Sequence, residues 1–190
     1  MLSNENSAAR SKPAALRLTQ LGMLSALAII LGLFKFPILP AAPYLEFDFA
    51  DVPILIGSLM FGGLPGLAIL FVVSSIQAFL MGGNGWIGFL MHFIASGTLV
   101  LVTSAIYRRS GKLGRMIAAL AVGALAMTAV MIPLNYIFTP LLFGCDRAFV
   151  TSVLVPAIIP FNLIKSVGNG LLAGVLYRAL SAILEKSGLL

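Results

Sequence analysis

The sequence PFNLIKSVGN, residues 160–169, lies inside a hydrophobic segment that runs from about Val150 to Leu184. A segment of this length and hydropathy predicts a membrane-spanning helix. Asn162, Lys165 and Asn169 are spaced i, i+3 and i+7, which puts their side chains on one face of that helix. A lysine near the bilayer centre costs roughly 3 kcal/mol on insertion scales, so a partner, a cavity or a ligand usually holds it. This face is the first candidate for a functional site.

The composition of the whole chain places it in a membrane. Of its 190 residues, 60% are hydrophobic and only 9% are charged, whereas soluble domains carry about 25% charged residues. The net charge of +6 could suggest a nucleic-acid partner. The basic residues, however, gather in the N-terminal tail, in a loop at 108–115 and near the C-terminus, and form no stripe with interleaved aromatics. We therefore expect no nucleic-acid partner, and membrane topology explains the charge better.

The hydrophobic runs and their breakers predict an all-α integral membrane protein, a compact bundle of six transmembrane helices. The expected helices cover residues 16–36, 52–61, 65–81, 86–107, 116–138 and 150–184. They form a single membrane domain of residues 16–184, with a polar, frayed N-terminal tail of residues 1–15 and a C-terminal tail of residues 185–190. Asp51 is expected to cap the second helix, and Pro133 to kink or open the fifth.

Six helices put both termini on the same side of the membrane. That side then carries most of the twelve basic residues, so the positive-inside rule predicts an N-in, C-in, multi-pass membrane protein. The second and third helices are short for a bilayer and are separated by Gly62 and Gly63. One re-entrant hairpin would fit the charge pattern equally well.

Two further regions could join the face of Lys165 in a binding pocket. Asn135 lies one turn from the outer end of the fifth helix, at a depth similar to that of Asn162. The outer loop Leu45-Glu46-Phe47-Asp48 alternates acidic with apolar residues and could fold over a pocket as a lid, with Glu46 pairing with Lys165 in the empty state. The alternatives are interhelical hydrogen bonds for the asparagines, a lysine that reaches to the interface, and an ordinary exposed loop.

Reactive groups are scarce in this chain. Cys145 is the single cysteine and His92 the single histidine, which excludes an internal disulfide, a zinc cluster and a multi-histidine metal site. There is no HExxH or GxSxG motif and no ATP-binding loop. We therefore expect a binding protein without enzymatic activity or cofactor. If it transports its ligand, the energy must come from another chain.

Gly22 and Ala26 lie four residues apart on the first helix. Small residues at this spacing allow another helix to approach closely. They could face a partner subunit or serve packing within the bundle.

Several segments, in order along nearly the whole chain, resemble the substrate-binding S components of energy-coupling factor (ECF) vitamin transporters, specifically the riboflavin-specific, RibU-like family. These segments are LFKFPI (33–38), FDFADVP (47–53), GWIG (85–88), LNY (134–136) and PFNLIK (160–165). The chain differs where members often carry Asn at the position of His92, Gly at that of Ser166, and charged residues in the stretch Ser74–Gln77.

The resemblance implies a six-helix bundle of the bacterial plasma membrane that binds riboflavin or a related flavin near the outer surface, under the first loop. It implies polar contacts to the ribityl chain from Asn135, Asn162 and Lys165. It also implies that small residues around Gly22 and Ala26 face a membrane-embedded coupling subunit, and that two ATPase subunits on other chains drive transport.

Three alternatives remain open from the sequence. The first is an S component for a different vitamin. The second is an intramembrane enzyme that uses Lys165 as a base or Schiff-base nucleophile, for which His92 is the one neutral-pH partner. The third is a structural or channel-forming bundle, for which the polar residues are too few and too clustered.

Overall fold

The structure, a computed structural model, describes residues 2–40, 42–107, 110 and 112–186. Its helices are α1 (Leu2–Leu31), α2 (Asp51–Phe61), α3 (Gly63–Leu80), α4 (Gly85–Tyr107), α5 (Leu113–Phe143), α6 (Arg147–Val153) and α7 (Ile159–Lys186), with a π-helical turn η1 (Leu154–Ile158) that joins α6 to α7. Two short strands, β1 (Phe36–Pro37) and β2 (Glu46–Phe47), pair antiparallel.

The helices have the length and composition of a membrane bundle. Within the described residues, five helical stretches are long and apolar enough to cross a bilayer, namely Ala14–Leu31, Gly63–Leu80, Gly85–Tyr107, Leu113–Phe143 and Arg147–Ile183. Large apolar side chains such as Leu64, Leu125 and Val175 point outward from the bundle, as expected where lipid replaces water. The predicted all-α membrane fold is confirmed.

The short helix α2 forms the centre of this bundle. Each residue from Asp51 to Met60 is buried, and the helix packs against α1, α3, α4 and α7. Its eleven residues are too few to span a bilayer. This helix does not need to span the bilayer, because other helices rather than lipid surround it.

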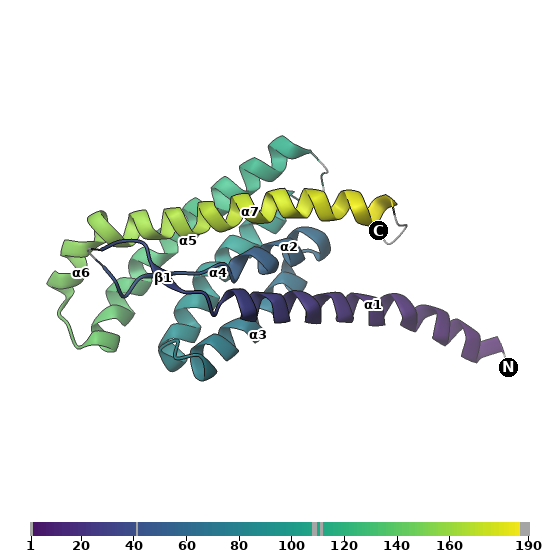
Figure 1. Cartoon of the computed structure of the whole chain (residues 1–190), viewed down its shortest axis with the longest axis horizontal. Helices are drawn as coiled ribbons and strands as arrows, with labels where there is room; N and C mark the ends of the chain where they lie inside the picture. Colours follow the sequence, from purple (N-terminus) through teal and green to yellow (C-terminus); the bar gives the residue numbers. More distant parts are fainter. Residues whose placement is uncertain (1, 41, 108–109, 111, 187–190) are drawn as a thin grey trace.

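Both ends of the chain lie at one end of the bundle, where α1 starts and α7 finishes (Figure 1). The β1–β2 hairpin and α6 lie towards the opposite end. Arg17 belongs to the first of these ends, where its guanidinium donates a hydrogen bond to the carbonyl of Phe61, the last residue of α2. The positive-inside rule makes this end cytoplasmic and the hairpin end external.

Several predicted boundaries are wrong. Helix α1 begins at Leu2, within the predicted tail of residues 1–15, and it ends at Leu31 instead of Phe36. It ends early because Phe36 turns into the strand that pairs with Phe47, which the sequence did not predict. At the other terminus α7 stays helical through Lys186, and residues 187–190 of the predicted tail lie outside the described residues.

The fifth helix is also longer than predicted. It continues through Pro133 and Pro140 to Phe143 and stops at Gly144, which has a left-handed φ of 65°. Membrane helices tolerate proline because neighbouring groups satisfy the freed carbonyls. The expected loop of residues 139–149 is therefore short, and Asp146 caps α6 by accepting a hydrogen bond from the backbone N–H of Phe149.

Asp51 does not cap α2 as predicted. It is the first residue of the helix, its side chain points into the protein, and the capping position is held by Ala50 without a side-chain cap. Asp48 instead provides a side-chain acceptor next to the start of the helix. Its Oδ1 accepts a hydrogen bond from the backbone N–H of Ala50 at 2.9 Å. Both acidic residues are thereby turned towards the interior of the outer half of the bundle.

The contact of α3 with α2 can be tested at Gly66. A Cβ there would lie 2.7 Å from the Cβ of Ser58 and 3.0 Å from Cγ1 of Val100. We expect Gly66→Ala to destabilise the fold by about 1–3 kcal/mol through overpacking, seen as a lower melting temperature in detergent. Gly114→Ala is the control, since a Cβ at this helical position meets open space. Equal effects of the two substitutions would contradict the described packing.

Candidate functional site

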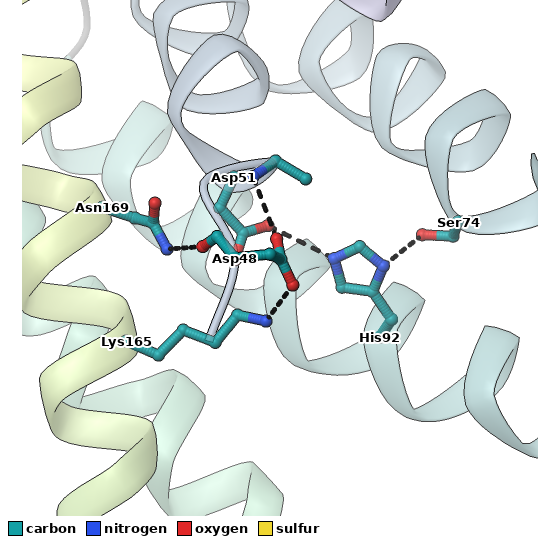
Figure 2. A network of polar contacts seen from close by, with 7 residues as sticks. Asp48, Asp51, Ser74, His92, Lys165 and Asn169 are labelled. Atoms are coloured by element: carbon teal, nitrogen blue, oxygen red, sulfur yellow. Dashed lines mark hydrogen bonds and ion pairs between the residues drawn. The ribbon is translucent and has the colours of Figure 1, made fainter. Parts of the chain in front are cut away.

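Lys165 of α7 binds Asp48, which follows β2. Its Nζ lies 2.7 Å from Oδ2 of Asp48, and both side chains are largely buried, at 12% and 8% exposure. One turn further along α7, the amide of Asn169 donates a hydrogen bond to the backbone carbonyl of Asp48 at 3.0 Å. Figure 2 shows Lys165 and Asn169 reaching from the same helix to this one residue. Helix α7 therefore holds the end of the outer loop through both a side chain and the backbone.

The predicted partner of Lys165, Glu46, is not the residue that binds it. Glu46 lies on β2 with its side chain exposed, whereas the next residue, Phe47, faces inward. The ring of Phe47 packs against those of Phe36 and Phe49, with centroids 5.4 and 5.1 Å away. Side chains alternate along a strand, so Asp48 would face outward like Glu46 if the strand continued. The strand ends at Phe47, and the side chain of Asp48 can therefore turn inward.

The other side of the outer loop rests on α5. The ring of Tyr44 lies 5.2 Å from that of Phe143, centroid to centroid. Burial raises the pKa of the Tyr44 hydroxyl. The loop is thus fixed at two places, by aromatic packing at Tyr44 and by the ion pair at Asp48.

A second polar group joins three helices beside the ion pair. Nε2 of His92 on α4 lies 3.3 Å from Oδ1 of Asp51 on α2, and its Nδ1 lies 3.1 Å from the hydroxyl of Ser74 on α3. Asp51 is 1% exposed. In Figure 2, Asp51 and Asp48 lie side by side between His92 and Lys165. The sequence left the role of His92 open, and the structure makes it the link between α2, α3 and α4.

A cavity of about 200 Å³ lies next to both polar groups. Its polar lining comes from Lys35, Asp48, Ser74, Gln77, Asn84, His92, Ser96, Asn162 and Lys165. Its apolar lining includes Ala78, Met91, Ala95, Met127, Met131 and Phe161. Methionine side chains adapt their shape to a flat apolar surface, and a few polar groups among apolar walls are typical of small-molecule sites. The cavity therefore suits a ligand with an apolar body and a polar part.

The predicted site residues divide into two groups. Asp48, Asn162 and Lys165 line the cavity, whereas Leu45, Glu46, Phe47, Asn135 and Asn169 lie outside its lining. The amide of Asn162 donates a hydrogen bond to the carbonyl of Ile158 at the end of η1, and the amide of Asn135 donates one to the carbonyl of Met131 in its own helix. Phe47 instead lines a wholly apolar groove between the hairpin and α7, together with Phe36 and Ile164.

Several lining residues were not among the site residues predicted from the sequence. Ser74 and Gln77 are three residues apart on α3, and His92, Ala95 and Ser96 share one face of α4. Polar residues at i, i+3 spacing on an otherwise apolar helix give the same signal that identified Asn162 and Lys165. The methionines carry no such signal, because a methionine on a membrane helix is ordinary.

The small residues of α1 point away from the bundle. Gly22 and Ala26 are exposed, and a Cβ at Gly22 would meet no other atom within 4 Å. Ala28 and Gly32, by contrast, are buried. Ala28 and Gly32 therefore serve packing within the chain, whereas Gly22 and Ala26 form a flat strip on the outside of α1.

The ion pair can be tested by a double-mutant cycle in the ligand-free protein. Asp48→Asn leaves the buried ammonium without its partner, and Lys165→Met leaves the carboxylate, so each should destabilise the fold by roughly 3–5 kcal/mol. The double variant should lose less than the sum, with a coupling of about 0.5–3 kcal/mol, measured by thermal or denaturant unfolding in detergent. Glu46→Gln is the control and should change little. Additive single effects would show that the two residues do not depend on each other.

The comparisons with known proteins agree with this architecture. The family described as ECF transporter, substrate-specific component, matches residues 16–177. The riboflavin transporter RibU of Staphylococcus aureus (strain TCH60) is 33% identical over 176 residues, which cover 90% of this chain and 93% of that protein. The riboflavin transporter FmnP of Bacillus subtilis (strain 168) is 32% identical over 161 residues, covering 80% and 84%.

A solved structure of the S component of a bacterial ECF transporter matches the fold with a TM-score of 0.80 at 33% identity. It covers 90% of this chain and 98% of its own. The buried α2, the hairpin over α7 and the cavity beneath it thus belong to a known kind of membrane protein. This chain is a member of the ECF transporter family of substrate-specific components, the S components.

Proposed function

We propose that this chain captures riboflavin at the outer face of the membrane and delivers it to a membrane-embedded coupling subunit, which two ATPase subunits on other chains drive. The observation that carries the proposal is the cavity beside the Lys165–Asp48 pair. It lies under the outer loop, and its lining combines methionines and a phenyl ring with amides and the ammonium groups of Lys35 and Lys165. Relatives that match most of this chain's length are riboflavin transporters, which supports riboflavin over another vitamin.

Riboflavin divides into two chemical parts that the lining could serve separately. The flat tricyclic ring is apolar on its faces and suits Met91, Met127 and Phe161. The ribityl chain carries hydroxyls that need donors and acceptors, which Asn162 and Lys165 offer. A buried polar group on either partner would be costly if left unpaired. The pairing of these groups therefore gives affinity and specificity together.

The cavity must enlarge to admit this ligand. Ligand pockets are commonly about 300–1,000 Å³, while the cavity here has about 200 Å³. The Lys165–Asp48 pair closes the loop onto α7, so exchange of Asp48 for a ligand hydroxyl on Lys165 would release the loop. We assign the residues outside the present lining, Leu45, Glu46, Phe47, Asn135 and Asn169, to contacts formed after that movement.

An intramembrane enzyme is the weaker reading. A Schiff-base lysine needs a free amine, whereas Nζ of Lys165 is held by the carboxylate of Asp48 at 2.7 Å. His92, the expected second catalytic group, is engaged by Asp51 and Ser74. The family membership also assigns this fold to substrate binding for transport.

Riboflavin titration of the purified protein tests the proposal. Lys165→Ala and Asn162→Ala should each weaken binding by roughly 10- to 100-fold, because each removes a buried hydrogen-bonding group from the ligand. The measurement is quenching of flavin fluorescence, and Lys112→Ala, exposed at the other end of the bundle, is the control. The same affinity in both cavity variants would remove these residues from the site. Another vitamin that raises the melting temperature more than riboflavin does would replace the ligand.

The contact with the coupling subunit is tested separately on α1. Gly22→Leu or Ala26→Leu should leave riboflavin affinity unchanged, because both positions lie outside the cavity. Either change should abolish riboflavin uptake by cells that hold the complete transporter, because a bulky side chain prevents close helix approach. Ala26→Gly keeps the strip flat and should retain uptake. Normal uptake in the leucine variants would place the coupling contact elsewhere.

A further inference from the structure

One buried amide in the cavity wall has a nitrogen without a hydrogen-bond partner among the residues that the structure describes. Gln77 of α3 is 7% exposed, and its Nε2 has no hydrogen-bond partner among the described residues. Native structures leave few buried amides unpaired, and each calls for a physical reason. Gln77 also lines the cavity, so a bound ligand could supply the missing partner.

The surroundings of Gln77 hold it in one place. Its backbone carbonyl accepts a hydrogen bond from the N–H of Gly83 at 3.0 Å, which folds the turn between α3 and α4 back onto it. A Cβ at Gly83 would lie 2.6 Å from the same carbonyl oxygen. On the other side, a Cβ at Gly32 would overlap Nε2 itself. Gly32 thus makes room for the side-chain amide of Gln77, and Gly83 makes room for its backbone carbonyl. The amide occupies a built position and not a loose surface contact.

Gln77 and Lys165 approach the cavity from different sides. Gln77 is three residues after Ser74 on α3 and so shares its face of the helix. In Figure 2, Ser74 and Lys165 lie on opposite sides of the two aspartates. The cavity therefore has polar groups of α7 at one side, polar groups of α3 at the other, and methionines in its lining.

We propose that Gln77 determines specificity by pairing with the imide edge of the flavin ring, an inference that rests on the proposed riboflavin function. If Asn162 and Lys165 hold the ribityl chain, the ring extends towards α3. Its imide presents an N–H between two carbonyls. A carboxamide presents one donor and one acceptor in the same plane, so the two groups form a pair of parallel hydrogen bonds, as glutamine does with a base edge in nucleic acids.

This assignment makes the imide N–H a recognised atom of the ligand. A site built to hydrogen-bond a group discriminates strongly against an analogue that lacks it, because its own buried polar atoms are then left unpaired. The probe is 3-methylriboflavin, in which a methyl group replaces the imide hydrogen. The wild-type protein should bind riboflavin at least about tenfold more tightly than this analogue.

Substitutions of Gln77 test whether this residue causes the preference for riboflavin over the methylated analogue. Gln77→Met keeps the length and volume of the side chain but removes both hydrogen-bonding atoms, so the preference for riboflavin should fall to nearly one. Gln77→Glu keeps an acceptor and removes the donors, and it should weaken riboflavin binding by about tenfold or more. Ser75→Ala, whose hydroxyl bonds only to Phe71 of its own helix, should keep the wild-type preference. Melting curves in detergent confirm that each variant is folded.

The outcomes separate this inference from the function on which it rests. Equal wild-type affinity for the two ligands overturns the role of Gln77, whatever the variants do. A Gln77→Met protein that still prefers riboflavin also overturns it, as does equal weakening towards both ligands, which would place Gln77 on another part of the flavin. A wild-type protein that binds neither ligand instead overturns the riboflavin proposal itself.

Discussion

The ion pair between Lys165 and Asp48 is the interaction on which the outer half of this protein depends. Burying an isolated ammonium or carboxylate at membrane depth is costly. Here each charged group offsets the desolvation cost of the other, because Nζ of Lys165 lies 2.7 Å from Oδ2 of Asp48. The same carboxylate accepts the N–H of Ala50 at the start of α2, while Asn169 binds its backbone carbonyl. One acidic residue therefore connects the loop, the buried helix and α7.

This arrangement explains how a stable fold can hold an accessible site. Breaking a buried ion pair is expensive unless new partners replace the old ones. A hydroxylated ligand offers such partners inside the protein, whereas lipid chains do not. In the function proposed here, the pair keeps the loop closed over the cavity until a ligand with suitable polar groups competes for Lys165. Beside it, the Asp51–His92–Ser74 group holds α2, α3 and α4 together without involving the loop.

The sequence predicted the membrane bundle, its topology and the face of Lys165, because these follow from hydropathy, charge placement and helical spacing. It did not predict that Asp48 rather than Glu46 would bind Lys165, since that choice depends on where a two-residue strand ends. Nor did it predict Gln77 in the cavity wall, because the room for its amide comes from Gly32, which follows α1 and is distant in sequence. Contacts between elements distant in sequence decide such details, and local patterns do not contain them.

A structure of the protein with riboflavin bound is the most direct test of the central claim, that the buried ammonium and its amide neighbour exist to hold a ligand from outside the cell. The account predicts flavin in the cavity beneath the loop, with Nζ of Lys165 within hydrogen-bond distance of a ribityl hydroxyl. Flavin bound elsewhere, with Lys165 still held by Asp48 alone, would contradict it.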